Sequence, residues 1–429
     1  MRLLLVLLGA FVALLYVTLY SPSSSAVNDA DVAGAFGEPI PGLSPAALQD
    51  FEGGRQTFLR RFTRSEGAGP HFNATSCASC HEDPVEGGSS QRYRDFFLAV
   101  ETQQDGTTKK AYEDCTVDNA PDAQTQLCLP SAVVPHYGPY GTIASPVAAA
   151  VEHAPTPAAA DVVARRNAPP LFGVGLFRLV SDEEILSRED PTDADGDGIS
   201  GRVNRISTED NAIGRFGFKC QTASIEAFNR GALQNQMGIT TDSLDLVSTE
   251  APRNQNLLDE LLGTKTAFAQ IAVPKDRIVD FDGVPDPELS RPLLSDLVFF
   301  QENLAAPARG IISSSVRRGE AVFGAVGCAD CHVPSLQTSL GLIYAFTDLL
   351  IHDMGTGDGV VMEQATGNEF RTQPLWGLCQ HPPFLHDGSA DTVRAAILAH
   401  DGEAADARNA YQNLGPDDSK DLHRFLESL

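Results

Sequence analysis

Basic residues are few in this chain of 429 residues. Its 31 lysines and arginines face 57 aspartates and glutamates, so the formal net charge at pH 7 is -26. A protein that binds nucleic acid needs the opposite balance, because Lys and Arg neutralise the phosphates. The composition therefore argues against a nucleic-acid partner. It leaves two explanations for the acidic surface, namely solubility and attraction of a basic protein partner.

Cysteine is also scarce, and half of the eight cysteines stand in two short clusters. These clusters are Cys77-Ala-Ser-Cys80-His81 and Cys328-Ala-Asp-Cys331-His332. No further Cys or His residues lie near either cluster at the spacing of a structural zinc site, which argues against zinc. C-x-x-C-H is instead the attachment signature of c-type haem. The two thiols bond to the porphyrin vinyl groups and the adjacent imidazole binds the iron, so the chain is expected to carry two covalent haems.

No cysteine stands directly after the apolar stretch at the N-terminus, so a lipid-anchored form is not expected. This stretch runs from Leu3 to Tyr20 after a single basic residue, and small residues follow it up to Ala26. The pattern is that of an export signal, which predicts a signal peptide over residues 1–26 and a periplasmic or exported protein. The apolar run also reaches the lower length limit of a membrane span, so an uncleaved anchor in the inner membrane is the alternative.

Four cysteines remain outside the two clusters: Cys115, Cys128, Cys220 and Cys379. An even remainder in an oxidising compartment suggests disulfides. Cys115 and Cys128 are the local pair, which leaves Cys220 to join Cys379 and tie the two halves of the chain together. The alternative is a set of buried free thiols.

A pattern repeats upstream of each cluster. Gly54-x-x-x-Phe58 precedes the first cluster, and Gly319-x-x-x-Phe323 precedes the second. Each half also ends in an amphipathic helical pattern, with apolar residues at i, i+3, i+4 and i+7. The repeat predicts a mostly α protein with two cytochrome c-like domains, each holding one c-type haem.

The expected organisation follows from this repeat. Residues 27–43 are rich in Gly, Pro and Ala and are predicted to be a linker. The N-terminal domain covers 44–306 and the C-terminal domain covers 307–429. Residues 82–165 show little periodicity, so we expect a long surface insertion with few regular elements.

An acidic loop in the N-terminal half resembles a calcium loop. Asp193, Asp195 and Asp197 alternate and Gly198 follows, which matches the first six positions of such a loop. The carbonyl of Ile199 is the next expected ligand. The twelfth position is Asn204 and not a bidentate Glu, so weaker calcium affinity is expected. The alternative is an acidic surface turn without a metal.

Several motifs, in this order along the chain, carry a family resemblance. They are G-P-H-F-N-A-T-S-C-A-S-C-H, D-A-D-G-D-G-I-S-G-R, G-R-F-G-F-K, Q-M-G-I-T, H-D-M-G, P-L-W-G-L, L-H-D-G and H-D-G-E-A. With them the chain resembles the bacterial di-haem cytochrome c peroxidase/MauG superfamily. The most similar branch is the di-haem oxidoreductases, which are often called thiol oxidoreductase-like or putative peroxidases. The motifs cover nearly the whole chain from about residue 50 onward.

The resemblance implies a role for each haem. In the family, electrons enter at the C-terminal haem, whose sixth ligand lies fourteen residues after the His of an [FY]-H-x-G motif. That count from His386 leads to His400. The N-terminal haem takes the peroxide, assisted by a Glu at the position of Gln236 and by a Trp at the position of Phe218. These two departures argue against strong peroxidase activity, because an amide cannot transfer a proton as a carboxylate does.

Three functions remain open at this stage. The first is a di-haem oxidoreductase that takes electrons from a small redox protein or cytochrome and reduces a small oxidant at the haem on His81. The second is a bis-His electron carrier without turnover, and the third is a haem-based sensor that binds a small ligand. The sixth ligand of the first haem stays undecided, with His136 and His153 as candidates. His71 stands too close to Cys77 in sequence to fold back onto the iron.

Overall fold

The computed structural model describes residues 32–69, 72–111, 132–135, 157–244, 280 and 282–429. Helix accounts for 34% and strand for 17%, which agrees with a mainly helical chain. The predicted signal peptide or anchor lies outside the described residues, and so do Cys115, Cys128, His71, His136 and His153. No helix in the described part is long and apolar enough to cross a membrane.

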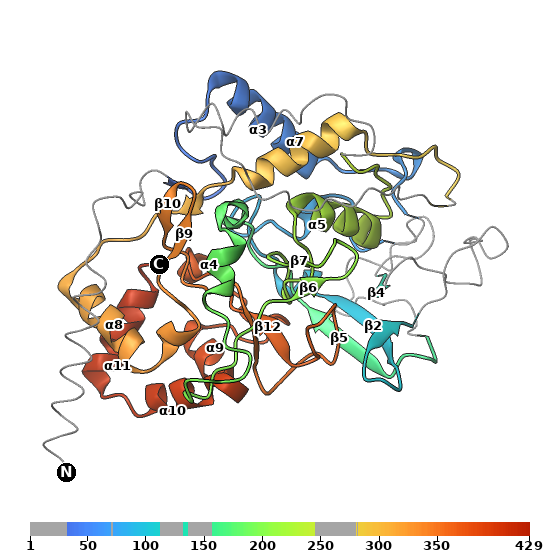
Figure 1. The fold of residues 1–429 in the computed structure, drawn as a ribbon. Helices are drawn as coiled ribbons and strands as arrows, with labels where there is room; N and C mark the ends of the chain where they lie inside the picture. Colours follow the sequence, from blue (N-terminus) through green and yellow to red (C-terminus); the bar gives the residue numbers. More distant parts are fainter. Residues whose placement is uncertain (1–31, 70–71, 112–131, 136–156, 245–279, 281) are drawn as a thin grey trace, which may run out of the picture.

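Two helices far apart in sequence pack together at the top of Figure 1, α3 (Pro45–Leu59) and α7 (Arg291–Glu302). The side chain of Ser44 caps α3, as expected for a serine before a helix-starting proline. Gly54 lies at the crossing, where an added Cβ would stand 1.9 Å from the carbonyl oxygen of Asp296. The two backbones can approach this closely only because residue 54 has no side chain.

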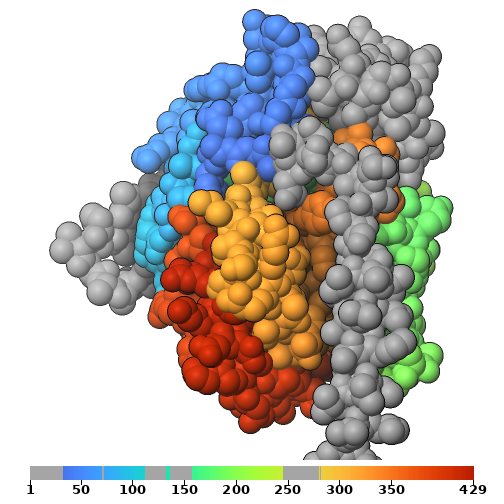
Figure 2. Space-filling model, turned by 90° about the vertical axis from the view of Figure 1, so that its left-hand side faces the viewer, coloured from blue at the N-terminus to red at the C-terminus, as the bar shows by residue number. Residues whose placement is uncertain are grey.

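A second helix pair repeats this arrangement with α8 (Ser314–Ala325) and α11 (Pro416–Leu426). Ser313 caps α8 in the same way. At this crossing a Cβ on Gly319 would stand 2.0 Å from the carbonyl oxygen of Asp421. Figure 2 shows the second pair below α3 on one face of the molecule. The repeated glycine pattern in the sequence therefore marks two helix crossings of the same kind.

The apolar core is not divided at the predicted domain boundary of 306/307. The largest cluster joins the α3–α7 pair to side chains from the second half, including Leu349, Leu350 and Trp376. A smaller cluster, built around α8 and α11, contains only residues of the second half. Near the boundary, β1 (Ala33–Gly34) pairs in parallel with β8 (Ala306–Pro307), so the start of the described chain is tied to the connection between the halves.

The expectation of few regular elements between residues 82 and 165 is wrong for its described part, which contains a four-stranded sheet. β2 (Phe96–Thr102) pairs antiparallel with β3 (Thr108–Lys110), β4 (Val133–Val134) and β5 (Val162–Arg166). Successive residues of β2 are buried, with Leu98 and Val100 in one apolar cluster and Ala99 in another. A strand covered on both faces lacks the alternation that marks a half-exposed strand in a sequence.

The remaining elements are short. The helices are α4 (Asp182–Leu186), α5 (Ile225–Ala232), α9 (Val393–Ala399) and α10 (Ala405–Gln412), and a π-helical turn (Leu233–Met237) continues α5. Three antiparallel pairs complete the strands: β6 (Arg205–Ile206) with β7 (Ala212–Ile213), β9 (Leu336–Thr338) with β10 (Gly341–Ile343), and β11 (Ile351–Asp353) with β12 (Glu369–Arg371).

The expected disulfide between Cys220 and Cys379 is wrong, because both cysteines are free. Cys220 is fully buried in a small cluster with Ile351 and Ala365, and its thiol donates to the carbonyl of Leu349 at 3.4 Å. Cys379, by contrast, is exposed. Burial raises the pKa of the Cys220 thiol to about 12. Cys220 is therefore a buried free thiol, which was the alternative expectation.

Candidate functional site

The first C-x-x-C-H cluster forms a single turn. Cys77–Ser79 is a 3-10 helix, and the amides of Cys80 and His81 both donate to the carbonyl of Cys77 at 3.1 Å. His81 Nδ1 donates to the carbonyl of Gly88 at 3.1 Å, and the ring of Phe58 lies 6.2 Å from the imidazole, centroid to centroid. Burial lowers the pKa of His81, so the imidazole is neutral. With Nδ1 held by a carbonyl, Nε2 is the nitrogen oriented for a metal.

The second cluster has the same geometry. Cys328–Asp330 is a 3-10 helix, and the amide of His332 donates to the carbonyl of Cys328 at 3.0 Å. His332 Nδ1 donates to the carbonyl of Phe346 at 2.9 Å, and Phe323 lies 6.4 Å from the imidazole. Burial lowers the pKa of His332 to about 4. Both turns therefore present a neutral, oriented imidazole beside two thiols.

His400 lies within electrostatic range of His332. It is the residue that ends α9, and its Nδ1 donates to the carbonyl of Ala396 at 2.7 Å. Burial lowers the pKa of His400, and its proximity is one of the effects that lower the pKa of His332. His400 thus has the same carbonyl-held Nδ1 as the two histidines of the turns, which leaves its Nε2 as the nitrogen not engaged by that carbonyl.

The residues of both turns fit c-type haem better than zinc. Burial raises the pKa of Cys77 to about 12, of Cys80 to about 11 and of Cys328 to about 12. A structural zinc site takes four protein ligands, whereas each turn supplies two thiols and one imidazole. Among the described residues, the groupings able to hold an ion consist of carboxylates alone and include no cysteine. A c-type haem instead needs two thiols and a neutral imidazole on one turn, and both turns supply them.

Gln236 lies against the loop that leads into the first turn. It stands in the π-helical turn after α5, and its carbonyl oxygen accepts from the amides of Asn73 at 2.8 Å and Ala74 at 3.1 Å. Its side-chain Oε1 accepts from Asn73 Nδ2 at 2.8 Å. The structure therefore brings this predicted residue close to Cys77. It offers amide groups for hydrogen bonding at this position and no carboxylate.

Phe218 is buried among cations. The guanidinium of Arg166 lies 6.0 Å from its ring, and the ammonium of the next residue, Lys219, is buried with Asp358. The single tryptophan of the chain, Trp376, stands elsewhere and stacks on Phe177 with ring centroids 5.5 Å apart. An aromatic residue is thus present at position 218, but the readily oxidised indole is not.

The acidic loop forms a cluster of carboxylates. One oxygen from each of Asp193, Asp195 and Asp197 lies within 4.8 Å of the others. The amide of Ile199 donates to Asp197 Oδ1 at 2.8 Å, which holds the loop in a turn. Burial raises the pKa of Asp330, and repulsion by Asp197 and Asp195 adds to this shift. The loop therefore lies beside the second C-x-x-C-H turn, which contains Asp330.

Sequence reasoning assigned no role to His352, which stands beside the second turn. Its Nε2 lies 2.8 Å from Asp348 Oδ2, its Nδ1 lies 2.8 Å from Glu403 Oε2, and the same nitrogen is 3.7 Å from Cys331 Sγ. Burial opposes protonation, but the charge of Asp348 and hydrogen bonds with Asp348, Cys331 and Glu403 raise the pKa of His352 well above 6.5. The H-D-M-G motif, which begins at His352, was the available signal. Glu403 could not be found from spacing.

Glu403 connects the second turn to the acidic loop. Its two carboxylate oxygens accept from the amide and the hydroxyl of Ser200, at 3.0 and 2.8 Å. Ser200 follows directly after the carboxylates of the loop, while His352 on the other side of Glu403 contacts Cys331. The ion cluster formed by Asp348, His352 and Glu403 therefore lies between the two.

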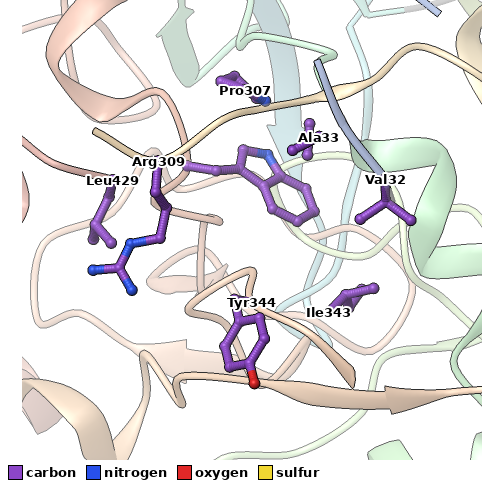
Figure 3. A pocket seen from close by; sticks show the side chains of 9 residues that line it. Val32, Ala33, Pro307, Arg309, Ile343, Tyr344 and Leu429 are labelled. Atoms are coloured by element: carbon purple, nitrogen blue, oxygen red, sulfur yellow. The ribbon is translucent and has the colours of Figure 1, made fainter. Parts of the chain in front are cut away.

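A small pocket lies away from these residues, at the junction of the halves (Figure 3). Val32, Pro307, Ile343 and Leu429 are among the side chains that line it, and no predicted site residue does so. The guanidinium of Arg309 lies over the rings of Phe346 and Phe425, at 5.7 and 5.6 Å. This pocket is a packing feature of the junction and not the candidate site.

A family model described as "Di-haem oxidoreductase, putative peroxidase" matches residues 110–429, which is well over half of the chain. Comparison with curated proteins gives no match. Among solved structures, the chain is similar to the diheme peroxidase BthA from Burkholderia thailandensis E264 at 15% identity. That match covers 93% of this chain and 92% of that chain, with a TM-score of 0.40.

Two further solved structures are similar at comparable levels. Hydrazine synthase from Kuenenia stuttgartiensis has 13% identity and a TM-score of 0.36, over 95% of this chain and 98% of that chain. A MauG-like protein associated with microbial copper homeostasis has 16% identity and a TM-score of 0.25, over 60% of this chain and 89% of that chain. Scores at this level carry no argument about function, which rests on the family match and on the geometry of the two turns.

Proposed function

Because the chain belongs to the family of di-haem oxidoreductases, we propose that it is a c-type di-haem oxidoreductase with one electron-entry site and one reaction site. When bound, the haems supply one-electron transfer from the C-terminal site to the N-terminal site and reduction of a small oxidant at the latter. The observation that carries the proposal is the pair of matching turns, of which the second has a further histidine, His400, close to His332.

The residues of the second turn support a closed site. His332 and His400 are both half-buried, desolvation lowers the pKa of both imidazoles, and both are held at Nδ1 by a backbone carbonyl. His332 and His400 would hold the haem iron through Nε2, and an iron held by two imidazoles would take up added ligands poorly. This arrangement suits electron entry from a small redox protein or cytochrome in the periplasm.

The residues near the first turn support a reaction site with weak peroxidase chemistry. Gln236 has its Oε1 engaged by Asn73, so the side-chain NH2 group is the part that can donate to a small oxidant. It can orient such a ligand, but it cannot transfer a proton as a carboxylate can. Slow reduction of peroxide is therefore expected from the unmodified chain.

The engaged amide of Gln236 also favours a second candidate function, an electron carrier without turnover. One experiment separates the two. The full chain is purified with its haems, reduced stepwise without oxygen, and followed by optical spectra before and after addition of hydrogen peroxide. A haem that binds carbon monoxide, together with steady peroxide consumption, supports the oxidoreductase. Two low-spin haems whose spectra do not change with carbon monoxide or hydrogen peroxide support the carrier. Carbon monoxide binding without peroxide consumption supports a sensor.

A substitution sharpens this experiment. Gln236→Glu restores a carboxylate beside the first turn and should raise the rate of peroxide reduction by about 100-fold, the lower end for a positioned proton-transfer group. Gln236→Leu is the matched control and should give no gain. Equal rates in both variants would show that residue 236 does not act on the oxidant.

We also propose that the acidic loop binds calcium through Asp193, Asp195, Asp197 and the carbonyl of Ile199. The convergence of three carboxylate oxygens supports this, because oxygen ligands at this spacing are what calcium requires. Calcium bound there would neutralise charge next to Asp330 of the second turn.

A further inference from the structure

Arg371 is a buried cation without a carboxylate partner in the described structure. It ends β12, is 6% exposed, and burial lowers the pKa of its guanidinium. One Nη donates to the carbonyl of Arg215 at 2.8 Å, and the other donates to Gln373 Oε1 at 2.7 Å. Its Nε is buried and has no hydrogen-bond acceptor. Both of these hydrogen bonds are to neutral oxygens, and the guanidinium also lies over the ring of Phe177 at 5.8 Å.

Two further donors around Arg371 are also left without acceptors. Gln373 Nε2 is buried and unpartnered, although its Oε1 is held by Arg371. Arg215, whose carbonyl accepts from Arg371, has an unpartnered Nε. Three buried N–H donors without acceptors, on residues linked to one another by hydrogen bonds, form a cluster that lacks an acceptor.

Three other buried cations in the described chain have a carboxylate partner. Arg166 and Lys219 share the buried carboxylate of Asp358. The side chain of Arg178 is 8% exposed, and its Nε lies 3.8 Å from Glu302 Oε2. An isolated charge in a protein interior costs several kcal/mol, so buried cations are normally paired. Arg371 departs from this rule, which points to an anion that binds there.

The position of Arg371 identifies the class of anion. Its partner across the β-pairing is Ile351, and the next residue, His352, contacts Cys331. Thr372 stands between Arg371 and Gln373. The carbonyl of Thr372 accepts a hydrogen bond from Thr347 Oγ1 at 2.6 Å. Thr347 is adjacent to Phe346, which holds His332. The unpartnered donors therefore lie on a segment that runs along the second turn, where a carboxylate carried by the haem ring can reach them.

We infer that Arg371 and Gln373 bind a propionate carboxylate of the haem attached at Cys328 and Cys331. The inference rests on the proposed function insofar as that haem must be attached. The guanidinium fork and the amide NH2 group match the two oxygens of a carboxylate. A cation held beside the ring favours the reduced iron, which carries less positive charge, and so raises the reduction potential.

The test uses the full haem-loaded chain and the variants Arg371→Met, Arg371→Lys and Gln373→Leu. Intact mass first establishes that two haems are attached in each protein, because thioether bonds do not depend on the propionates. Spectroelectrochemistry then gives the reduction potential of each haem. Arg371→Met should lower the potential of the haem on His332 and leave that of the haem on His81 unchanged. Arg371→Lys should restore most of the lost potential, and Gln373→Leu should give a smaller fall in the same direction.

Arg178→Met is the matched control, since Arg178 is equally buried but has its own carboxylate partner. It should reduce thermal stability without moving either potential. If Arg371→Met does not fold, the Arg371→Lys and Gln373→Leu proteins decide the matter. Unchanged potentials in folded, doubly loaded variants, or a change confined to the haem on His81, would overturn the inference. Absence of haem from the wild-type chain would instead overturn the proposed function.

Discussion

The two C-x-x-C-H turns have the same supporting frame and different surroundings. In each, a glycine allows two helices to cross closely, a phenylalanine lies near the imidazole, and a carbonyl holds Nδ1. The carbonyl for the first turn belongs to Gly88, in the loop that follows it. The carbonyl for the second belongs to Phe346, and His400 and the ion cluster of His352 stand beside it. The shared glycine, phenylalanine and carbonyl support cofactor attachment at both turns. The neighbouring residues, which differ, determine the reactivity of each cofactor.

The largest effect is expected from the two glycines at the helix crossings. Gly319→Ala places a methyl group 2.0 Å from the carbonyl of Asp421 and Gly54→Ala one 1.9 Å from the carbonyl of Asp296. Each should cost about 3 kcal/mol of unfolding free energy, the upper end for overpacking, measured by denaturant titration. Gly319→Ala should alter the spectrum of the second haem alone, and Gly54→Ala that of the first alone.

Gly231→Ala is the control for the glycine variants. Gly231 lies in α5, and an added Cβ there would meet only Asn235 Nδ2 at 3.9 Å. Because alanine favours helix, this variant should be as stable as the wild type or up to about 1 kcal/mol more stable. If Gly54→Ala and Gly319→Ala behave like this control, the shared frame is not built on close helix crossings.

Substitution of His400 should change the spin state or the reduction potential of the second haem. In His400→Ala the second haem should become high-spin or take up water, and in His400→Met its reduction potential should rise, because a thioether donates less to ferric iron than an imidazole. Optical spectra and potentiometry measure both. His423→Ala is the control, since the Nε2 of His423 is already bonded to the hydroxyl of Tyr411 at 2.8 Å. Spectra that stay the same in both His400 variants would remove the main difference between the two sites.

A smaller effect is expected from His352→Gln, which removes the cation between Asp348 and Glu403. Loss of these charged hydrogen bonds should cost about 2 kcal/mol of unfolding free energy near pH 6. Burial raises the pKa of Glu403, but hydrogen bonds from His352 and Ser200 outweigh this effect and lower the pKa of Glu403 from 4.5 to about 2. This carboxylate therefore stabilises the wild type above pH 4.5, and the stabilisation is lost as the pH falls from 4.5 toward 2.

The pH dependence provides the check on His352. The stability difference between the wild type and His352→Gln should shrink as the pH falls through this range. The raised pKa of His352 has the opposite sign, so its contribution is complete below pH 6.5 and declines only as the pH rises through its folded value. His423→Gln should show neither trend. A difference that stays constant from pH 6 to pH 2 would mean that the ion cluster does not stabilise the second turn.

The smallest effect is expected from calcium. A ligand at ten times its dissociation constant adds about 1.4 kcal/mol to folding, and the loop has no bidentate Glu at its last position. Chelation should therefore lower the melting temperature slightly and disturb the second haem more than the first, because the loop lies beside Asp330. Asp195→Asn should abolish the response, whereas Asp105→Asn, at an exposed turn elsewhere, should keep it. A response that survives in Asp195→Asn would place the calcium at another site.

Sequence reasoning predicted what short spacing determines. The turns at Cys77 and Cys328 and the glycine pattern before each turn follow from spacing within a few residues, and the choice of His400 follows from a count that the family resemblance supplies. It failed where contacts join distant segments. The sheet around Phe96–Thr102 is hidden by burial on both faces, and Glu403 meets His352 only through the fold. The prediction of a disulfide failed for the same reason, because an even number of cysteines does not show where Cys220 lies in the fold.

The crossing of α3 and α7 has a consequence for assembly. α3 ends at Leu59, before the first turn, whereas α7 begins only at Arg291. The first turn therefore cannot be enclosed until most of the chain has been made, while the second needs only the segment from Ser314 to Leu426. Non-local pairing of this kind slows folding, which keeps Cys77 and Cys80 accessible for longer. Attachment at the first turn thus has a wider time window, and a chain truncated before α7 should leave that turn permanently open.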